Sequence, residues 1–184
     1  FDAAGRTSAV TNALGHRSTY VYDAAGQPTE VQDARGNRVT SVYDAAGRVI
    51  QVIDQLGRRT TFSYDGAGQQ TLRIDARGRR TTYAFDGAGR RTGIVYQEGT
   101  RVTLSYDAAG SQSLMQDATG VTTYVYDAAS RLTEVVHPGT KRVTYGYDAS
   151  GARSVMVDPD GGRTTYSYDV AGRLIRALPT DQRA

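Results

Sequence analysis

The sequence predicts an all-β fold, a repetitive antiparallel meander of β-hairpins with about 21 residues per repeat. Three observations lead to this prediction. An aromatic residue followed by Asp, two variable residues and Gly or Ser occurs nine times, at spacings of 20 or 21 residues. Each repeat holds two turn signals, and the residues between them alternate between two faces. With 21 Gly and 39% apolar residues in 184, the composition favours short strands over helices.

The first turn of each repeat is the aromatic-Asp pattern itself. Its Asp can accept hydrogen bonds from turn N–H groups, and its Gly tolerates the positive φ of a left-handed residue. We therefore expect these residues to be the structural turns of the array. They are Tyr22, Asp23, Gly26, Tyr43, Asp44, Gly47, Tyr64, Asp65, Gly68, Phe85, Asp86, Gly89, Tyr106, Asp107, Gly110, Tyr126, Asp127, Tyr147, Asp148, Gly151, Tyr168, Asp169 and Gly172. Phe1 begins inside such a turn with no initiator Met, which indicates a fragment of a longer chain.

Two strands per repeat are expected between the turns. In the repeat of residues 44–64 they are 48–53 and 58–64, joined by a second turn that begins at Asp54. Phe62 and Tyr64 share one face of the second strand, so the predicted sheet has an aromatic face and a polar face. The middle of the first strand is usually apolar, at Val10, Val31, Val52, Ile94, Met115, Val135 and Met156, with Arg73 as the exception.

Two repeats depart from the pattern. The segment 120–126 is one residue short, and His137-Pro138-Gly139 replaces the usual second turn. Because a slip of one residue inside a strand would exchange its faces, we expect the shortening to be absorbed beside Gly120.

The repeats resemble those of the Rhs/YD-repeat family. From Gly162 to Leu174 the chain reads GRTTYSYDVAGRL, which is similar to the family pattern of an aromatic pair, Asp, two variable residues, Gly-Arg and an apolar residue. The resemblance extends over essentially all 184 residues. It implies a curved or spiralling sheet that is part of a hollow Rhs/YD shell, as in bacterial polymorphic toxins, the encapsulating component of insecticidal toxin complexes, and animal teneurins.

The resemblance also implies partners and a location. Flanking repeats or domains of the same polypeptide are expected, with an encapsulated C-terminal toxin as the cargo of the bacterial shells. It implies a secreted or cell-surface protein, although this chain has no signal segment. No membrane insertion is expected, because no window approaches 18 consecutive apolar residues.

No catalytic, cofactor-binding or metal-binding residues are predicted, and no enzymatic activity. Carboxylates of one series are a whole repeat apart, His16 and His137 are far apart, and Cys is absent. The stretch from Asp158 to Gly161 resembles the site at which Rhs cores end and self-cleave, but Asp158 falls in the ordinary second-turn column and another repeat follows. We interpret it as a turn.

One column of arginines lies at the start of the second strands, on the face opposite the aromatics. It consists of Arg17, Arg38, Arg59, Arg80, Arg101, Arg142 and Arg163. Such a stripe, with a net charge of +3, could bind nucleic acid, anionic glycans or an acidic cargo. We favour a solvated face instead, balanced by the 19 acidic residues, and do not expect nucleic acid as the partner.

The function predicted from the sequence is structural. Residues 1–184 would form a single YD-repeat array, a segment of a shell that encapsulates or presents an attached toxin or effector domain. One alternative is a cell-surface adhesion module that binds glycans or proteins. Another is a self-assembling β fibre, since an open sheet has edge strands that can pair with other chains.

Overall fold

The computed structural model describes residues 1–180 and confirms the all-β prediction. Regular structure in these residues is β-strand, apart from one 3₁₀ turn, η1 (Pro138–Thr140). The chain divides into two compact units, Phe1–Arg90 with Ile94–Gly99, and Arg91–Gly93 with the residues from Thr100 onward. Strand β9 (Arg91–Tyr96) contributes residues to both.

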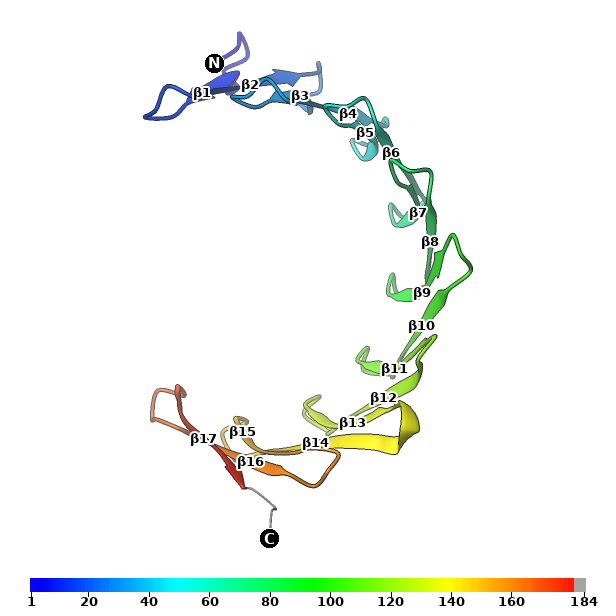
Figure 1. The fold of residues 1–184 in the computed structure, drawn as a ribbon, viewed down its shortest axis with the longest axis vertical. Helices are drawn as coiled ribbons and strands as arrows, with labels where there is room; N and C mark the ends of the chain where they lie inside the picture. The colour runs from blue at the N-terminus through cyan, green and yellow to red at the C-terminus, as the bar shows by residue number, and fades with distance from the viewer. Residues whose placement is uncertain (181–184) are drawn as a thin grey trace. The chain divides into compact units, whose positions relative to one another are not determined.

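The first unit is an antiparallel meander of eight consecutive strands. Each strand pairs with the next in chain order, without a crossover (Figure 1). The strands are β1 (Ala9–Thr11), β2 (Arg17–Tyr22), β3 (Pro28–Gln32), β4 (Arg38–Tyr43), β5 (Val49–Ile53), β6 (Arg59–Tyr64), β7 (Gln70–Ile74) and β8 (Arg80–Phe85).

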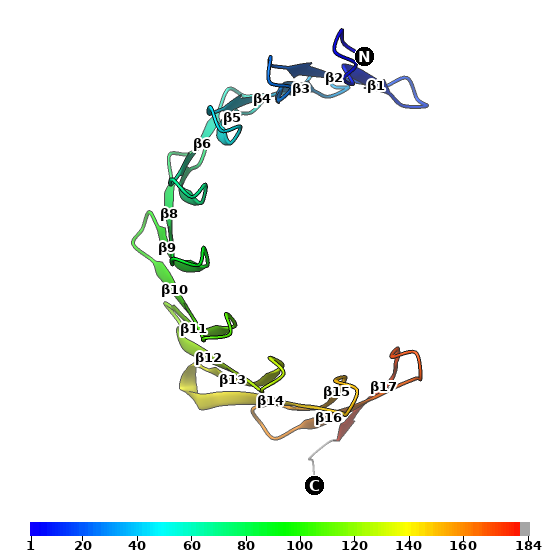
Figure 2. The ribbon, with the colours of Figure 1, turned by 180° about the vertical axis from the view of Figure 1, so that it is seen from behind.

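The second unit repeats the same arrangement. Its strands also pair antiparallel with their neighbours in sequence, which is visible from behind in Figure 2. They are β10 (Arg101–Tyr106), β11 (Gln112–Asp117), β12 (Gly120–Tyr126), β13 (Leu132–His137), β14 (Lys141–Tyr147), β15 (Arg153–Val157), β16 (Arg163–Tyr168) and β17 (Leu174–Thr180). The meander places first turns along one edge of each unit and second turns along the other.

A β-bulge follows the first turn in repeat after repeat. In the pairing of β6 with β7, Ser63 lies opposite Leu72 and Tyr64 opposite Gln70, so Thr71 is the extra residue. The Thr71 hydroxyl donates a hydrogen bond of 3.3 Å to the carbonyl of Ser63. Bulges bend a strand and increase its twist. The bulge recurs at hairpins closed by first turns and is absent from those closed by second turns, such as β5 with β6.

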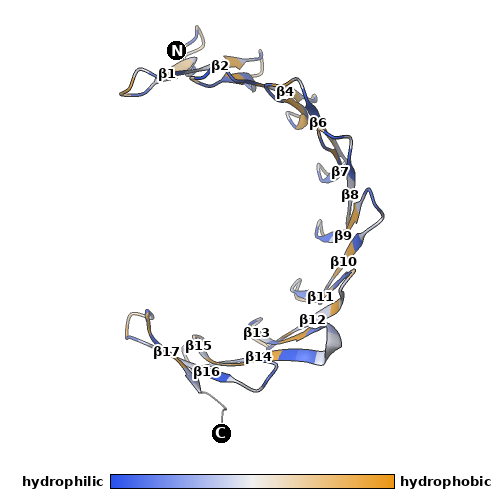
Figure 3. Ribbon diagram, viewed as in Figure 1, coloured by the Kyte–Doolittle hydropathy of each residue, from blue (hydrophilic) through white to orange (hydrophobic). Residues whose placement is uncertain are grey.

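Each unit is a single layer of sheet. Among the described residues, Val135 is the only apolar side chain that is buried, with 6% exposed. It lies between Tyr124 of β12 and Val143 of β14. The predicted aromatic columns are half-buried, and hydrophobic and hydrophilic residues are interleaved along the strands (Figure 3). A layer without a deep core depends on contacts between neighbouring repeats.

The short repeat is accommodated at the turn, as the sequence predicted. Asp117 pairs with Gly120 across a two-residue connection, and the register from there to Thr123 is uninterrupted. Gly120 has a φ of +130°, and a Cβ there would lie 2.9 Å from the Cβ of Pro138. The faces of β12 are therefore preserved.

No helix in residues 1–180 has the length and apolar character needed to cross a membrane.

Candidate functional site

The first turns share one hydrogen-bond pattern, and the turn at Asp44 shows it completely. The N–H of Gly47 donates to the Asp44 carbonyl (3.0 Å), and the Asp44 N–H donates to the carbonyl of Arg48 (2.9 Å). Asp44 Oδ1 accepts the N–H groups of Ala46 (2.9 Å) and Arg48 (3.0 Å). Asp44 Oδ2 accepts Arg48 Nε at 2.8 Å. The Asp side chain thus closes the turn with one oxygen and holds a cation with the other.

The predicted turn residues occupy equivalent places in the other repeats. Every first-turn Asp of the described residues accepts the N–H four positions later on Oδ1. The Gly residues have positive φ, and Ser130 takes the same role with a φ of 59°.

These hydrogen bonds lower the pKa of several turn carboxyls. The backbone N–H of Arg48 contributes most to the lowered pKa of Asp44, followed by the Arg48 side chain. At the second turn of Asp75, burial alone would raise the pKa, but hydrogen bonds from the side chain of Arg79 and the N–H groups of Arg79 and Arg77 outweigh it and bring the pKa to about 2. The turn aspartates with lowered pKa are therefore ionised at neutral pH.

Six of the first-turn tyrosines reach back to residues just after the preceding first turn. Tyr64 Oη donates a hydrogen bond of 2.8 Å to the carbonyl of Val49, 15 residues earlier. The same bond, 2.6–3.0 Å long, is formed by Tyr22, Tyr43, Tyr106, Tyr126 and Tyr147. In the short repeat the acceptor of Tyr126 is 14 residues earlier, at Gln112. The hydroxyl bond therefore ties each of these first turns to the start of the strand that follows the turn before it.

An arginine connects two successive first turns. Arg48 Nη1 donates to the backbone carbonyl of Asp65 in the next turn (3.1 Å), while its guanidinium lies 4.8 Å from the ring centroid of Tyr64. Arg6 makes the equivalent contacts with Asp23 and Tyr22, at 3.0 and 4.7 Å. We call this arrangement, in which one guanidinium contacts its own Asp carboxylate, the next Tyr ring and the next Asp carbonyl, the arginine bridge.

Comparison with known proteins identifies the repeats. The family described as RHS Repeat matches residues 1–38, 43–80, 126–162 and 147–183, which together make up more than two thirds of the chain. This chain belongs to the RHS repeat family. No curated protein matches it at a significant level.

Solved structures share the fold of these RHS repeats. The crystal structure of TcdB2-TccC3 matches with a TM-score of 0.83 and 20% identity, over 99% of this chain and 11% of that one. The Tc holotoxin pore of Photorhabdus luminescens matches with a TM-score of 0.72 and 18% identity, over 89% of this chain and 10% of that one. The RHS array therefore spans about a tenth of the length of these proteins.

The arginine that forms the bridge at Arg6 and Arg48 recurs in every second RHS repeat. The position after the turn Gly or Ser is Arg at 6, 48, 90, 131 and 173, and Gln27, Gln69, Ser111 and Ala152 stand between them. Gln27 Oε1 is buried and accepts no hydrogen bond from residues 1–180. At Ser111 no guanidinium is available, and burial together with the charge of Asp107 raises the pKa of Tyr126. The sequence analysis missed this column, although its two-repeat period was the available signal.

The arginine column singled out from the sequence lies elsewhere, at the second-turn edge. All seven of its members are exposed. Arg38 and Arg142 form cross-strand ion pairs with Glu30 and Glu134, at 3.2 and 3.4 Å. In the described residues, no group of three or more His, Cys, Asp or Glu side chains is placed to hold a metal ion. The chemistry of this RHS sheet is concentrated in links between repeats.

Proposed function

We propose that residues 1–184 act as one repeat array, a segment of the wall of a larger RHS shell that encapsulates or presents an attached toxin or effector domain. The structural nature of the RHS repeat and the fold shared with TcdB2-TccC3 support this role. The match covers nearly all of this chain but only 11% of that one, so the array corresponds to a small part of a much longer chain.

The observation that carries the proposal is the link between repeats. The arginine bridge joins one first turn to the next, the tyrosine hydroxyl joins a first turn to the strand that follows the turn before it, and neither points to a bound substrate. With Val135 as the single buried apolar side chain of residues 1–180, the sheet has almost no core of its own. Such a layer is suited to be a wall that is stabilised by its own continuation.

The proposed partners follow from the wall role. They are flanking repeats of the same polypeptide and an attached toxin domain, on the analogy of the Tc toxin structures, which contain TccC3 together with TcdB2. We propose a secreted or cell-surface location and no catalytic role for the array itself.

The intact mass of the native polypeptide tests the proposal. We expect a mass many times the 19.8 kDa of this chain, and a C-terminal segment that resists protease until the shell is denatured. A native mass near 19.8 kDa would contradict the shell role and favour the adhesion module or the fibre. A large mass with a C-terminal segment that is cleaved freely would contradict encapsulation.

A further inference from the structure

The arginine bridge defines a small binding slot between successive first turns. Around Arg48 its walls are Asp44 Oδ2, the ring of Tyr64 and the carbonyl of Asp65, and the guanidinium contacts all three. A planar guanidinium can donate to a carboxylate and a carbonyl at once while it lies over an aromatic face, which an ammonium cannot do equally well. The chemistry of the slot is therefore selective for guanidinium.

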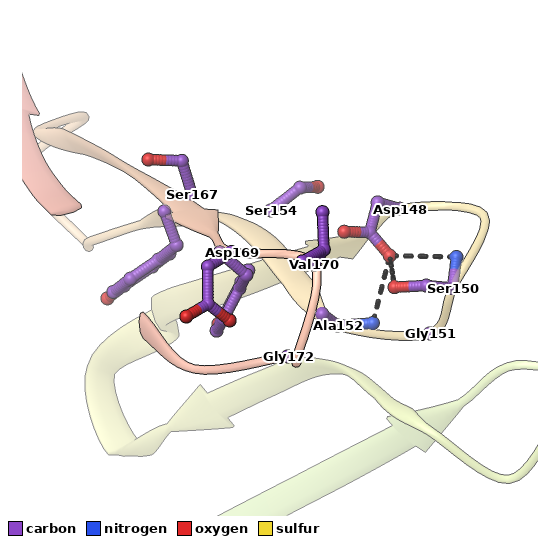
Figure 4. Close-up of a pocket in the computed structure, with 11 residues that line it drawn as sticks. Asp148, Ser150, Gly151, Ala152, Ser154, Ser167, Asp169, Val170 and Gly172 are labelled. Carbon is purple, nitrogen blue, oxygen red and sulfur yellow. Dashed lines mark hydrogen bonds between the residues drawn. The ribbon is translucent and has the colours of Figure 1, made fainter. Parts of the chain in front are cut away.

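Four repeats lack the arginine, and Ala152 is the smallest of the residues that replace it. At Ala152 the side chain ends at Cβ, and the equivalent walls are Asp148, Tyr168 and Asp169. These three residues line an open cavity of about 830 Å³, shown in Figure 4. By comparison, one water molecule takes up about 30 Å³ in the liquid. The cavity has room for a guanidinium and for the chain that carries it.

The carboxylate of Asp148 is held in the position of a bridge acceptor. Its Oδ1 accepts the N–H of Ser150 (2.9 Å), the hydroxyl of Ser150 (2.6 Å) and the N–H of Ala152 (3.0 Å). These bonds leave Oδ2, which points away from Ser150 and Ala152 (Figure 4). In the turn at Asp44, Oδ2 is the oxygen that binds the arginine. Asp148 thus keeps the turn-closing bonds and presents the second oxygen for a cation.

We propose that this slot binds the guanidinium group of an arginine side chain from a separate polypeptide segment. A peptide is the favoured source because the cavity extends beyond the three walls to Ser154 and Ser167, whose hydroxyls can bond a backbone. The site is independent of the shell role, since it follows from the contacts of Arg48 and their absence at Ala152.

The test uses the 184-residue chain and blocked Gly-Gly-Arg-Gly-Gly as the probe. We expect saturable binding with a dissociation constant on the order of 1 mM, with NMR shift changes confined to the amides around Ala152, Tyr168 and Asp169. The Ala152→Arg variant carries its own guanidinium and is expected to lose the binding. The Asp148→Asn variant is expected to bind about tenfold more weakly, because the charged acceptor is lost.

Two controls keep the test independent of folding. Asn12 closes its turn in the same way, accepting the N–H groups of Leu14 and His16 on Oδ1, so Asp148→Asn is compatible with the turn. Arg131→Ala removes the guanidinium that lies 4.6 Å from the Tyr147 ring, and is expected to create a second slot for the peptide. Circular dichroism verifies that each variant is folded.

Three results would overturn the proposal. They are unchanged peptide binding in Ala152→Arg, equal binding of the same peptide with Lys in place of Arg, and no binding to the wild-type chain. Methylguanidinium distinguishes a guanidinium carried by a peptide from one carried by a small molecule. Binding as tight as that of the peptide would overturn the peptide occupant in favour of a small molecule, and binding at least about tenfold weaker would support it.

Discussion

The repeat junctions at Arg48 and at Ala152 have the same type of turn, but they differ in the side chain that connects this turn to the next one. Asp44 and Asp148 each close a turn through Oδ1 and accept the N–H of the residue four positions later. At Arg48 a guanidinium then connects that turn to the next Tyr and Asp, whereas at Ala152 the same place is an open cavity. The turn is complete without the arginine, so turn formation and coupling between repeats are carried by different side chains.

Acidification is expected to cause the largest loss of stability, because it protonates the turn aspartates of both junctions. The pKa of Asp44 and of Asp148 lies below the ordinary value of 3.8, through the backbone N–H of Arg48 and the hydroxyl of Ser150 respectively. A group with a lowered folded-state pKa contributes stability above its unfolded pKa and loses it as the pH falls through the folded value. We expect the urea midpoint to be constant above pH 5 and to fall steeply between about pH 4 and pH 2.

Carboxyl titrations followed by NMR sharpen this prediction. In an Arg48→Ala variant the pKa of Asp44 should rise toward 3.8, because the guanidinium hydrogen bond is removed, while that of Asp148 should not change. A stability maximum below pH 4, or equal shifts at both residues, would contradict the role given to the turn carboxylates.

The next largest effect is expected from loss of the bridge itself. Arg48→Ala should lower the free energy of unfolding by about 2 kcal/mol, because charge-assisted hydrogen bonds and a cation–π contact are lost together. Arg173→Ala is the matched control, since Arg173 pairs with Asp169 but its side chain is 82% exposed, against 33% for Arg48. Urea denaturation of both variants tests this prediction. Equal losses of unfolding free energy would show that only the ion pair of the arginine with the Asp of its own turn contributes to stability.

The sequence was sufficient for the turns because their chemistry is local. An Asp closing a turn and a Gly at positive φ, as at Asp44 and Gly47, need no knowledge of distant residues, and the meander follows from their spacing. The compensation for the short repeat at Gly120 was equally local. Fold and strand boundaries were therefore accessible from sequence.

The links between repeats were not accessible in the same way. The contact of Arg48 with Asp65 joins residues 17 apart, and that of Tyr64 with Val49 joins residues 15 apart. Their formation depends on the offset of neighbouring hairpins, which the bulge at Thr71 helps to set. Sequence analysis instead emphasised the column of Arg59, which is exposed at a strand start. The periodicity of a sequence shows which residues recur at equivalent positions, but not which of them are in contact in the fold.

The tyrosine hydroxyl gives a smaller, separable effect at the same junction. Tyr64→Phe keeps the ring that lies under Arg48 and removes the bond to Val49, so we expect a loss of about 1 kcal/mol. Hydrogen exchange should show the loss as faster exchange confined to β5, β6 and their turns. Tyr96→Phe, at an exposed tyrosine outside the two aromatic columns, is the control and should be nearly neutral. If both variants behave alike, the hydroxyl bond does not couple the repeats.

The smallest expected effect is a gain in stability, from a substitution that gives the junction at Ala152 the arginine of the junction at Arg48. Ala152→Arg places a guanidinium between Asp148 and Tyr168, where the walls of the slot are already present, and should stabilise the chain by about 0.5–1 kcal/mol. The gain is smaller than the loss in Arg48→Ala because ordering a long side chain costs conformational entropy and the slot is open to water. Ala149→Arg adds the same charge at an exposed position of the same turn and should change stability little. If the two additions raise the urea midpoint equally, the benefit is one of net charge, and the open slot at Ala152 is not equivalent to the filled one at Arg48.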